Sequence, residues 1–129
     1  MSLKSIRIVF LLCGCYDIAL GVIFGLFYPA IYSWAGVAGP NHPGYVQLSA
    51  MYVAVFGIGF LFVYRDPLAN RAIVPLGFLM KLGFCVVAFG HMIFGTIPSF
   101  YVPLAVLDLI TLGIFAVAWR SIRRAGVKV

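Results

Sequence analysis

The chain has 129 residues, of which 64% are hydrophobic and only 9% are charged, and its formal net charge is +6. A soluble domain carries about 25% charged residues. This composition therefore excludes an ordinary water-exposed surface and indicates that lipid covers much of the protein. The length allows a single domain. We expect no nucleic-acid partner, because nothing beyond the net charge points to one.

Four apolar runs are long enough to cross about 30 Å of hydrocarbon, which takes about 20 residues. They cover residues 8–28, 46–64, 72–95 and 101–119. Because these runs are apolar on all faces, they are typical of lipid-embedded helices. The predicted fold class is all-α, a bundle of four transmembrane helices in one integral membrane domain. The first run is too long for the core of a signal peptide, so we expect an uncleaved helix.

The connecting segments differ in character. Residues 29–45 are uncharged, and residues 39–44 carry a strong turn signal of Gly, Pro and Asn. In the segment 65–71, Asp66 and Pro67 predict the end of a helix, and Asn70 is expected to cap the helix that follows. Residues 96–100 predict a tight turn.

The basic residues predict the orientation of the bundle. Eight of the nine lie at the chain ends or in the segment 65–71, and they are Lys4, Arg7, Arg65, Arg71, Arg120, Arg123, Arg124 and Lys128. The positive-inside rule then places both termini and this segment in the cytoplasm. Small multidrug transporters also have four helices and an acidic residue in the first, as Asp17 is here. Those that form antiparallel dimers need a weak charge bias, so we do not expect that arrangement.

Three charged residues fall inside the predicted spans, namely Asp17, Lys81 and Asp108. At about 1.5 Å per residue from the nearest cytoplasmic arginine, they lie about 15 Å, 15 Å and 18 Å deep. Three helices thus bring one charge each to a common level near the middle of the membrane. Small residues flank each charge on its own helix face, so we expect the charges to point into the bundle.

Two interpretations of these charges stay open. A buried Asp–Lys–Asp cluster can simply fix which helices touch, as polar residues often do in membrane bundles. Alternatively, two carboxylates and one ammonium leave one negative charge over, so that a proton or a cation must balance it. A group in that balance can relay protons or couple ion movement.

A second set of residues gathers toward the outer face. His42 lies in the outer loop and His91 about 30 Å along its helix from Arg71, so the two side chains could meet. No third ligand at a diagnostic spacing accompanies them, so we expect no metal site. His91 is expected to bond a carbonyl or a tyrosine. Trp34, Tyr45 and Tyr101 form an interfacial belt, a partner surface or the cover of a lipophilic pocket.

The sequence has few features of an enzyme. It contains no glutamate, no serine–histidine–acid set, no zinc-binding HExxH run and no phosphate-cradling glycine loop. Its three cysteines, Cys13, Cys15 and Cys85, lie in apolar runs and are expected to be packing residues with no disulfide. We therefore expect a protein that is not an enzyme and has no tightly bound cofactor beyond lipid or quinone.

Three features carry a family resemblance: the glycine-spaced first helix through Asp17, Gly21 and Gly25, the turn RDPLANR at 65–71, and LGFLMKL at 76–82. Together they resemble the DoxX-like and related uncharacterised four-helix membrane proteins of bacteria. The resemblance implies the bacterial inner membrane as the location. Some DoxX-type proteins are subunits of quinone-linked oxidoreductases, and no catalytic residue is implied.

The favoured functional prediction is a non-catalytic accessory subunit of a larger membrane complex of respiratory or photosynthetic type, with membrane lipids and other subunits as partners and with lipid or quinone as ligand. The alternative is a small homo-oligomeric transporter that couples to protons or ions through Asp17, Lys81 and Asp108. A third hypothesis is an enzyme that uses His42 and His91 with a bound cofactor.

Overall fold

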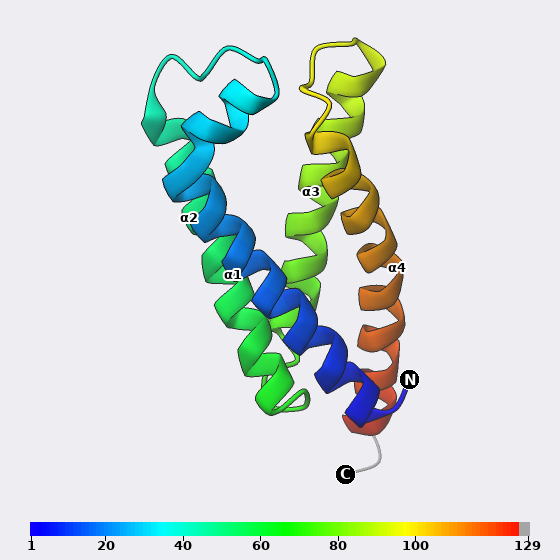
Figure 1. The fold of residues 1–129 in the computed structure, drawn as a ribbon. Coiled ribbons are helices and arrows are strands. Elements are labelled where there is room, and N and C mark those ends of the chain that lie inside the picture. Colours follow the sequence, from blue (N-terminus) through cyan, green and yellow to red (C-terminus); the bar gives the residue numbers. More distant parts are fainter. Residues whose placement is uncertain (127–129) are drawn as a thin grey trace.

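The computed structural model describes residues 1–126 and shows four helices within them (Figure 1). These are α1 (Leu3–Trp34), α2 (Pro43–Arg65), α3 (Ile73–Ile93) and α4 (Tyr101–Gly126). Each is long and apolar enough to cross a membrane. The chain is thus an all-helical protein of four candidate membrane spans. Lys128, one of the basic residues of the topology prediction, lies outside the described residues.

Three helices are longer than the sequence predicted, and α1 and α4 differ from the prediction more than α2 does. α1 begins at Leu3 and continues through Pro29 to Trp34, although we expected it to end before this proline. Proline removes one backbone hydrogen bond, and membrane helices tolerate that loss. α4 continues to Gly126, with Arg123 and Arg124 in its last turn. Cationic side chains there interact favourably with the negative end of the helix dipole.

The segment between α2 and α3 is organised differently from our prediction. The Asn70 amide does not cap α3, whose N-cap position is Ala72 without a side-chain hydrogen bond. It donates instead to the carbonyls of Phe62 and Asp66, 3.0 Å away in each case. Asn70 therefore closes the C-terminal end of α2, where helix carbonyls lack partners.

Small residues let α1 and α2 pack closely as a pair. A Cβ added to Gly21 would lie 2.6 Å from the carbonyl oxygen of Ala50, and one added to Gly57 would lie 2.8 Å from that of Gly14. Such distances leave no room for a side chain, so the two backbones meet directly. α3 and α4 form the second pair, and the two pairs separate toward the loops at 35–42 and 94–100 (Figure 1).

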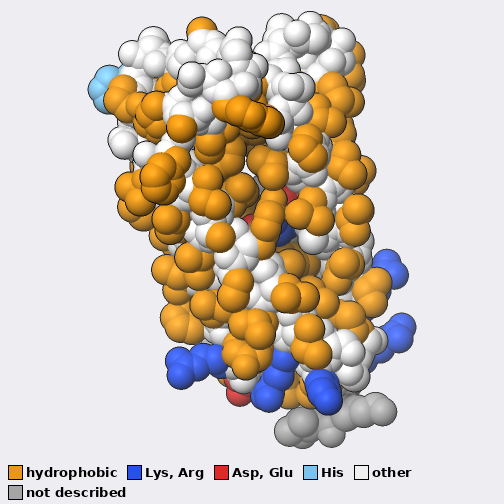
Figure 2. All heavy atoms as spheres, in the orientation of Figure 1, with side chains coloured by type: hydrophobic (Ala, Val, Ile, Leu, Met, Phe, Trp, Pro, Cys, Tyr) orange, Lys and Arg blue, Asp and Glu red, His pale blue; other side chains and the backbone are white. Residues whose placement is uncertain are grey.

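The two ends of the bundle differ in polarity. Lys and Arg side chains surround the end where α1 starts and α4 ends, which we call the basic end, and apolar side chains cover most of the surface above it (Figure 2). We call the opposite end, which carries the 35–42 and 94–100 segments, the loop end. The buried apolar core lies toward the basic end and includes Ile6, Phe10, Phe60, Phe115 and Ile122.

Candidate functional site

A cavity of about 370 Å³ lies between the two helix pairs, on the loop-end side of the apolar core. Residues from all four helices line it, and most of them are apolar or aromatic. Ligand cavities in proteins usually measure about 300–1,000 Å³ and have mostly apolar walls with a few polar groups. This cavity has both properties, so it is the candidate site.

The charged residues Asp17, Lys81 and Asp108 are among those that line the cavity. The Lys81 ammonium lies 2.8 Å from Oδ1 of Asp108 and 3.3 Å from Oδ1 of Asp17. Asp17 and Lys81 are each 1% exposed, and Asp108 is 8% exposed. The structure thus brings together the three residues that the sequence placed at one level, and it turns them inward. Figure 2 shows acidic and basic atoms in a hollow between the helix pairs, halfway along the molecule.

The carboxylate oxygens of this cluster are not equally satisfied. Oδ2 of Asp17 is buried and has no hydrogen-bond partner in the described chain. The hydrogen bonds found among residues 1–126 also include none to Oδ2 of Asp108, whose side chain is 11% exposed. Both residues line the cavity, and the side chain of Asp108 is more exposed than that of Asp17, which is 2% exposed. Buried polar atoms without partners are rare and costly.

Helical periodicity explains which neighbours share the cavity with the charges. On α1, Leu20, Gly21 and Phe24 follow Asp17 by three, four and seven residues, and all three line the cavity. On α3, Phe84 follows Lys81 by three residues. On α4, Leu104 precedes Asp108 by four residues. The aromatic walls at Phe24 and Phe84 were absent from our predicted site, although counting along each helix from its charge would have found them.

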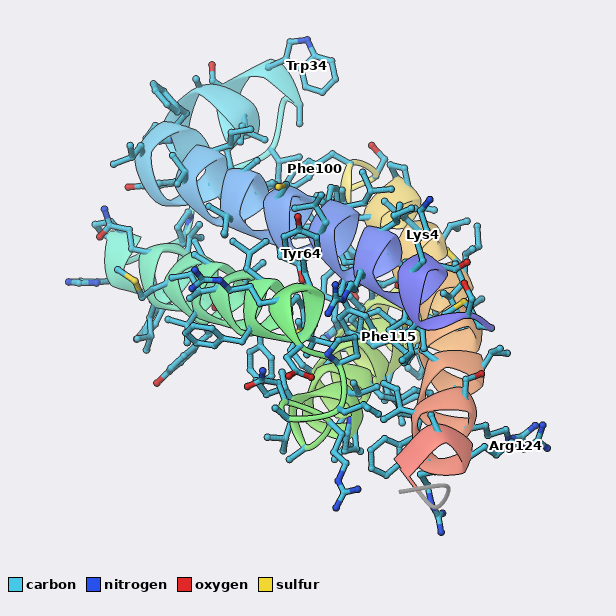
Figure 3. All side chains as sticks on the ribbon, turned by 90° about the horizontal axis from the view of Figure 1, so that it is seen from below. Lys4, Trp34, Tyr64, Phe100, Phe115 and Arg124 are labelled. Atoms are coloured by element: carbon cyan, nitrogen blue, oxygen red, sulfur yellow. The ribbon has the colours of Figure 1, made fainter. Side chains whose placement is uncertain are left out.

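Three phenyl rings separate the cavity from the basic end. The ring centroid of Phe10 lies 4.6 Å from that of Phe115 and 5.6 Å from that of Phe60. The Lys81 ammonium lies 5.9 Å from the Phe60 ring, so the charged layer rests directly on these rings. In Figure 3, which views the bundle from the basic end, Phe115 lies within the ring of helices. We call Phe10, Phe60 and Phe115 the phenyl layer.

Aromatic residues join α1 to α4 at the loop end of the cavity. The Tyr32 and Tyr101 hydroxyls lie 3.1 Å apart, and both residues line the cavity. Tyr32 is on the last turns of α1 beyond Pro29, so this contact depends on the unexpected length of the helix. Phe24 stacks on Tyr101 with their ring centroids 6.1 Å apart.

Of the five residues predicted at the outer face, two line the cavity and three do not. Tyr45 and Tyr101 line the cavity. Trp34 is 83% exposed and projects away from the bundle (Figure 3). His42 caps α2 by accepting from the Gly44 amide at 3.0 Å. His91 contacts the Thr96 hydroxyl at 2.9 Å, not the carbonyl or tyrosine that we expected.

The two histidines therefore serve local turns and do not form a shared site. Within residues 1–126, no three His, Cys, Asp or Glu side chains are placed to hold a metal ion. Cys13, Cys15 and Cys85 are free thiols. Cys85 is buried, and its thiol lies 3.5 Å from the carbonyl of Ala105, so it links α3 to α4.

Comparison with family models, with curated proteins and with solved structures finds no match for this chain. The fold and the cavity describe an all-helical protein of four candidate membrane spans with a charged cavity between two helix pairs.

Proposed function

We propose that this protein is a non-catalytic membrane subunit that holds a lipophilic molecule between its two helix pairs. The observation that carries the proposal is the cavity of about 370 Å³ with mostly apolar walls and a cluster of three charged residues. Apolar walls favour a lipophilic body, and a few polar groups at one end fix its orientation. A lipid or a quinone has this division between body and head.

We further propose that the protein lies in the bacterial inner membrane with its basic end in the cytoplasm, as part of a larger assembly of respiratory or photosynthetic type. The basic residues at one end support the orientation. The apolar surface of the spans, with side chains such as Leu26 and Val86 more than half exposed, offers area for lipid and for partner helices. The likeness to DoxX-type proteins supports the location.

A ligand-blocking variant tests the proposal. Val53 lines the cavity on α2, whereas Val55 on the same helix is 54% exposed on the outside. We expect Val53→Trp to fill the cavity and Val55→Trp to leave it open. After extraction into lipid nanodiscs, native mass spectrometry should show a bound lipophilic molecule on the wild-type protein and on Val55→Trp, and none on Val53→Trp.

The same spectra test the assembly. Other subunits in fixed stoichiometry support an accessory role, whereas a lone homo-oligomer contradicts it. Equal ligand occupancy in Val53→Trp and the wild type would contradict the binding proposal.

A second candidate function is a proton- or ion-coupled transporter. The favouring observation is the unbalanced charge of the cluster together with the partnerless Oδ2 of Asp17. A transporter should lose coupled flux on Asp108→Asn while it stays folded. A cluster that only packs helices should lose stability instead.

A further inference from the structure

The charge of the cluster decides what kind of lipophilic molecule suits the cavity. Asp17 and Asp108 carry two negative charges when ionised, and Lys81 carries one positive charge. Among residues 1–126, Lys81 is the only basic residue that lines the cavity, so no other basic side chain of this part of the chain balances the remaining charge there. An unbalanced charge in a low-dielectric interior is costly, and it is neutralised by a proton or by a counter-ion.

The geometry places the two carboxylates in different roles. The Lys81–Asp108 contact, at 2.8 Å, is shorter than the Lys81–Asp17 contact, at 3.3 Å. Asp17 also keeps a buried oxygen without a partner. Asp17 is therefore the group on which a neutralising proton is held when the cavity has no cation. Asp108 offers an oxygen on the cavity side, where the charge of a ligand would lie.

The walls of the cavity suit a positive charge with an organic body. The aromatic residues on the walls come from all four helices, and they are Tyr16, Phe24, Tyr32, Tyr45, Phe84 and Tyr101. Aromatic faces attract cations within about 6 Å of the ring centroid, and more strongly where water is excluded. The Lys81 ammonium already makes such a contact with Tyr16, at 5.9 Å from the ring centroid.

From these observations we infer that the cavity binds a monovalent lipophilic cation, such as an organic ammonium, in exchange for one proton. The inference rests on the proposed ligand-holding function and names the chemical class of the ligand. When the cation enters, Asp17 releases its proton through the cavity to water, and both carboxylates are then ionised. The bound cation and Lys81 together balance them, so the occupied and the protonated states carry the same charge.

Several titratable groups face Asp17, and the exchange has to be separated from their titration. These are Cys13 and Tyr16 on α1, Lys81 and Cys85 on α3, Asp108 on α4, and Tyr45 on α2 nearer the loop end. Of these, only the two carboxylates ordinarily ionise below neutral pH. A loss of cation binding on acidification therefore reports on Asp17 and Asp108.

Benzyltrimethylammonium is a suitable probe, because its charge does not depend on pH. Its neutral isostere, neopentylbenzene, has the same shape with carbon in place of nitrogen. Titration calorimetry of the purified protein in detergent, repeated in buffers of different ionisation enthalpy, measures affinity and proton release together. We expect saturable binding of the cation with about one proton released, and an affinity that falls by up to about tenfold per pH unit on acidification.

Two variants test whether cation binding and proton release depend on the charged cluster or on another part of the molecule. Asp17→Asn should abolish both cation binding and proton release. Asp66→Asn, which changes the only other acidic residue and lies outside the cavity, should leave both unchanged. Circular dichroism and gel filtration show whether each variant is folded. If Asp17→Asn does not fold, the pH dependence and the proton count of the wild-type protein still decide the matter.

Other outcomes overturn the inference in distinguishable ways. Cation binding without proton release, or unchanged binding by folded Asp17→Asn, contradicts the exchange. Saturable binding of neopentylbenzene alone, blocked by Val53→Trp, shows a neutral ligand site such as a lipid or quinone would use. In that case the inference fails while the proposed function stands. If neither probe binds and Val53→Trp changes no ligand occupancy, both fail.

Discussion

At the scale of single residues, Lys81 on α3 connects three helices through its contacts with α1 and α4. Its ammonium bonds carboxylates from two other helices, at 2.8 Å and 3.3 Å, and its side chain also contacts the phenyl layer. A buried ion pair often adds little net stability over apolar packing, but removing one partner leaves a charge uncompensated. Substitutions of Lys81 can therefore distinguish the charge that this residue neutralises from the packing that it provides.

We predict that Lys81→Met destabilises the protein by about 3–5 kcal/mol, because the carboxylate that Lys81 neutralises then stays in a dry interior without a counter-charge. The triple variant Asp17→Asn, Lys81→Met and Asp108→Asn should recover most of this loss. Unfolding by SDS, followed by circular dichroism, gives the free energies. Lys4→Met is the matched control at an exposed position, and it should stay close to the wild type. Equal stability of Lys81→Met and wild type would contradict an ionised cluster.

Much of this site could be predicted from the sequence. The depths of Asp17, Lys81 and Asp108 follow from helix rise and the nearest arginines, and small neighbours indicated that they point inward. The unequal satisfaction of the two carboxylates could not be predicted. It depends on sub-ångström differences in how Lys81 reaches across from α3, and helical spacing does not resolve those.

At the scale of the helices, the contact between α1 and α2 depends on glycine. Gly21 faces the backbone of α2 at Ala50, whereas Gly83 on α3 has no atom within 4 Å of an added Cβ. The two glycines have the same chemistry in the same kind of helix. They differ in what lies opposite.

We predict that Gly21→Ala destabilises the protein by about 1–3 kcal/mol, because the added methyl group pushes the paired helices apart. Gly83→Ala should leave stability unchanged or raise it by up to about 1 kcal/mol, since alanine favours the helix. Thermal unfolding of both variants in one detergent makes the comparison. A Gly21→Ala protein as stable as Gly83→Ala would show that the close approach of α1 and α2 is not needed.

The sequence predicted the presence of the four helices correctly, but it predicted their ends less accurately. The apolar runs located all four helices. The continuation of α1 past Pro29 was missed because proline is a helix breaker in water, and the rule is weaker in a lipid-facing helix. Asn70 was assigned to the wrong helix because an amide in a short turn can serve either neighbour. The carbonyls of Phe62 and Asp66, which accept from its amide, come within hydrogen-bond distance only in the folded turn.

At the scale of the whole molecule, the pairing of the helices determines where the cavity lies, and the orientation determines which side of the membrane it faces. The charge bias supports a basic end in the cytoplasm, and the cavity then faces the opposite half of the membrane. The volume of the cavity could not be predicted from the sequence, because it depends on the angle between two helix pairs whose shared apolar core lies toward the basic end.

We predict that a cysteine at Ser99 reacts with a membrane-impermeant maleimide in intact cells, and that a cysteine at Ala69 reacts only after permeabilisation. Both positions are exposed, and they lie in connections at opposite ends of the bundle. The native thiols, all within helices, are first replaced by alanine. The reverse labelling pattern would invert the proposed orientation and place the mouth of the cavity on the cytoplasmic side.

The phenyl layer has a consequence for the movement of a bound molecule through the protein. In this conformation the cavity does not continue to the basic end, because three packed rings from three helices lie between the two. A molecule held in the cavity, as proposed above, would therefore leave on the side by which it entered, and this conformation would hold it without passing it to the basic end. Passage would require the Phe115 ring on α4 to move away from the Phe10 and Phe60 rings on α1 and α2, and a rocking of one helix pair against the other would produce that movement.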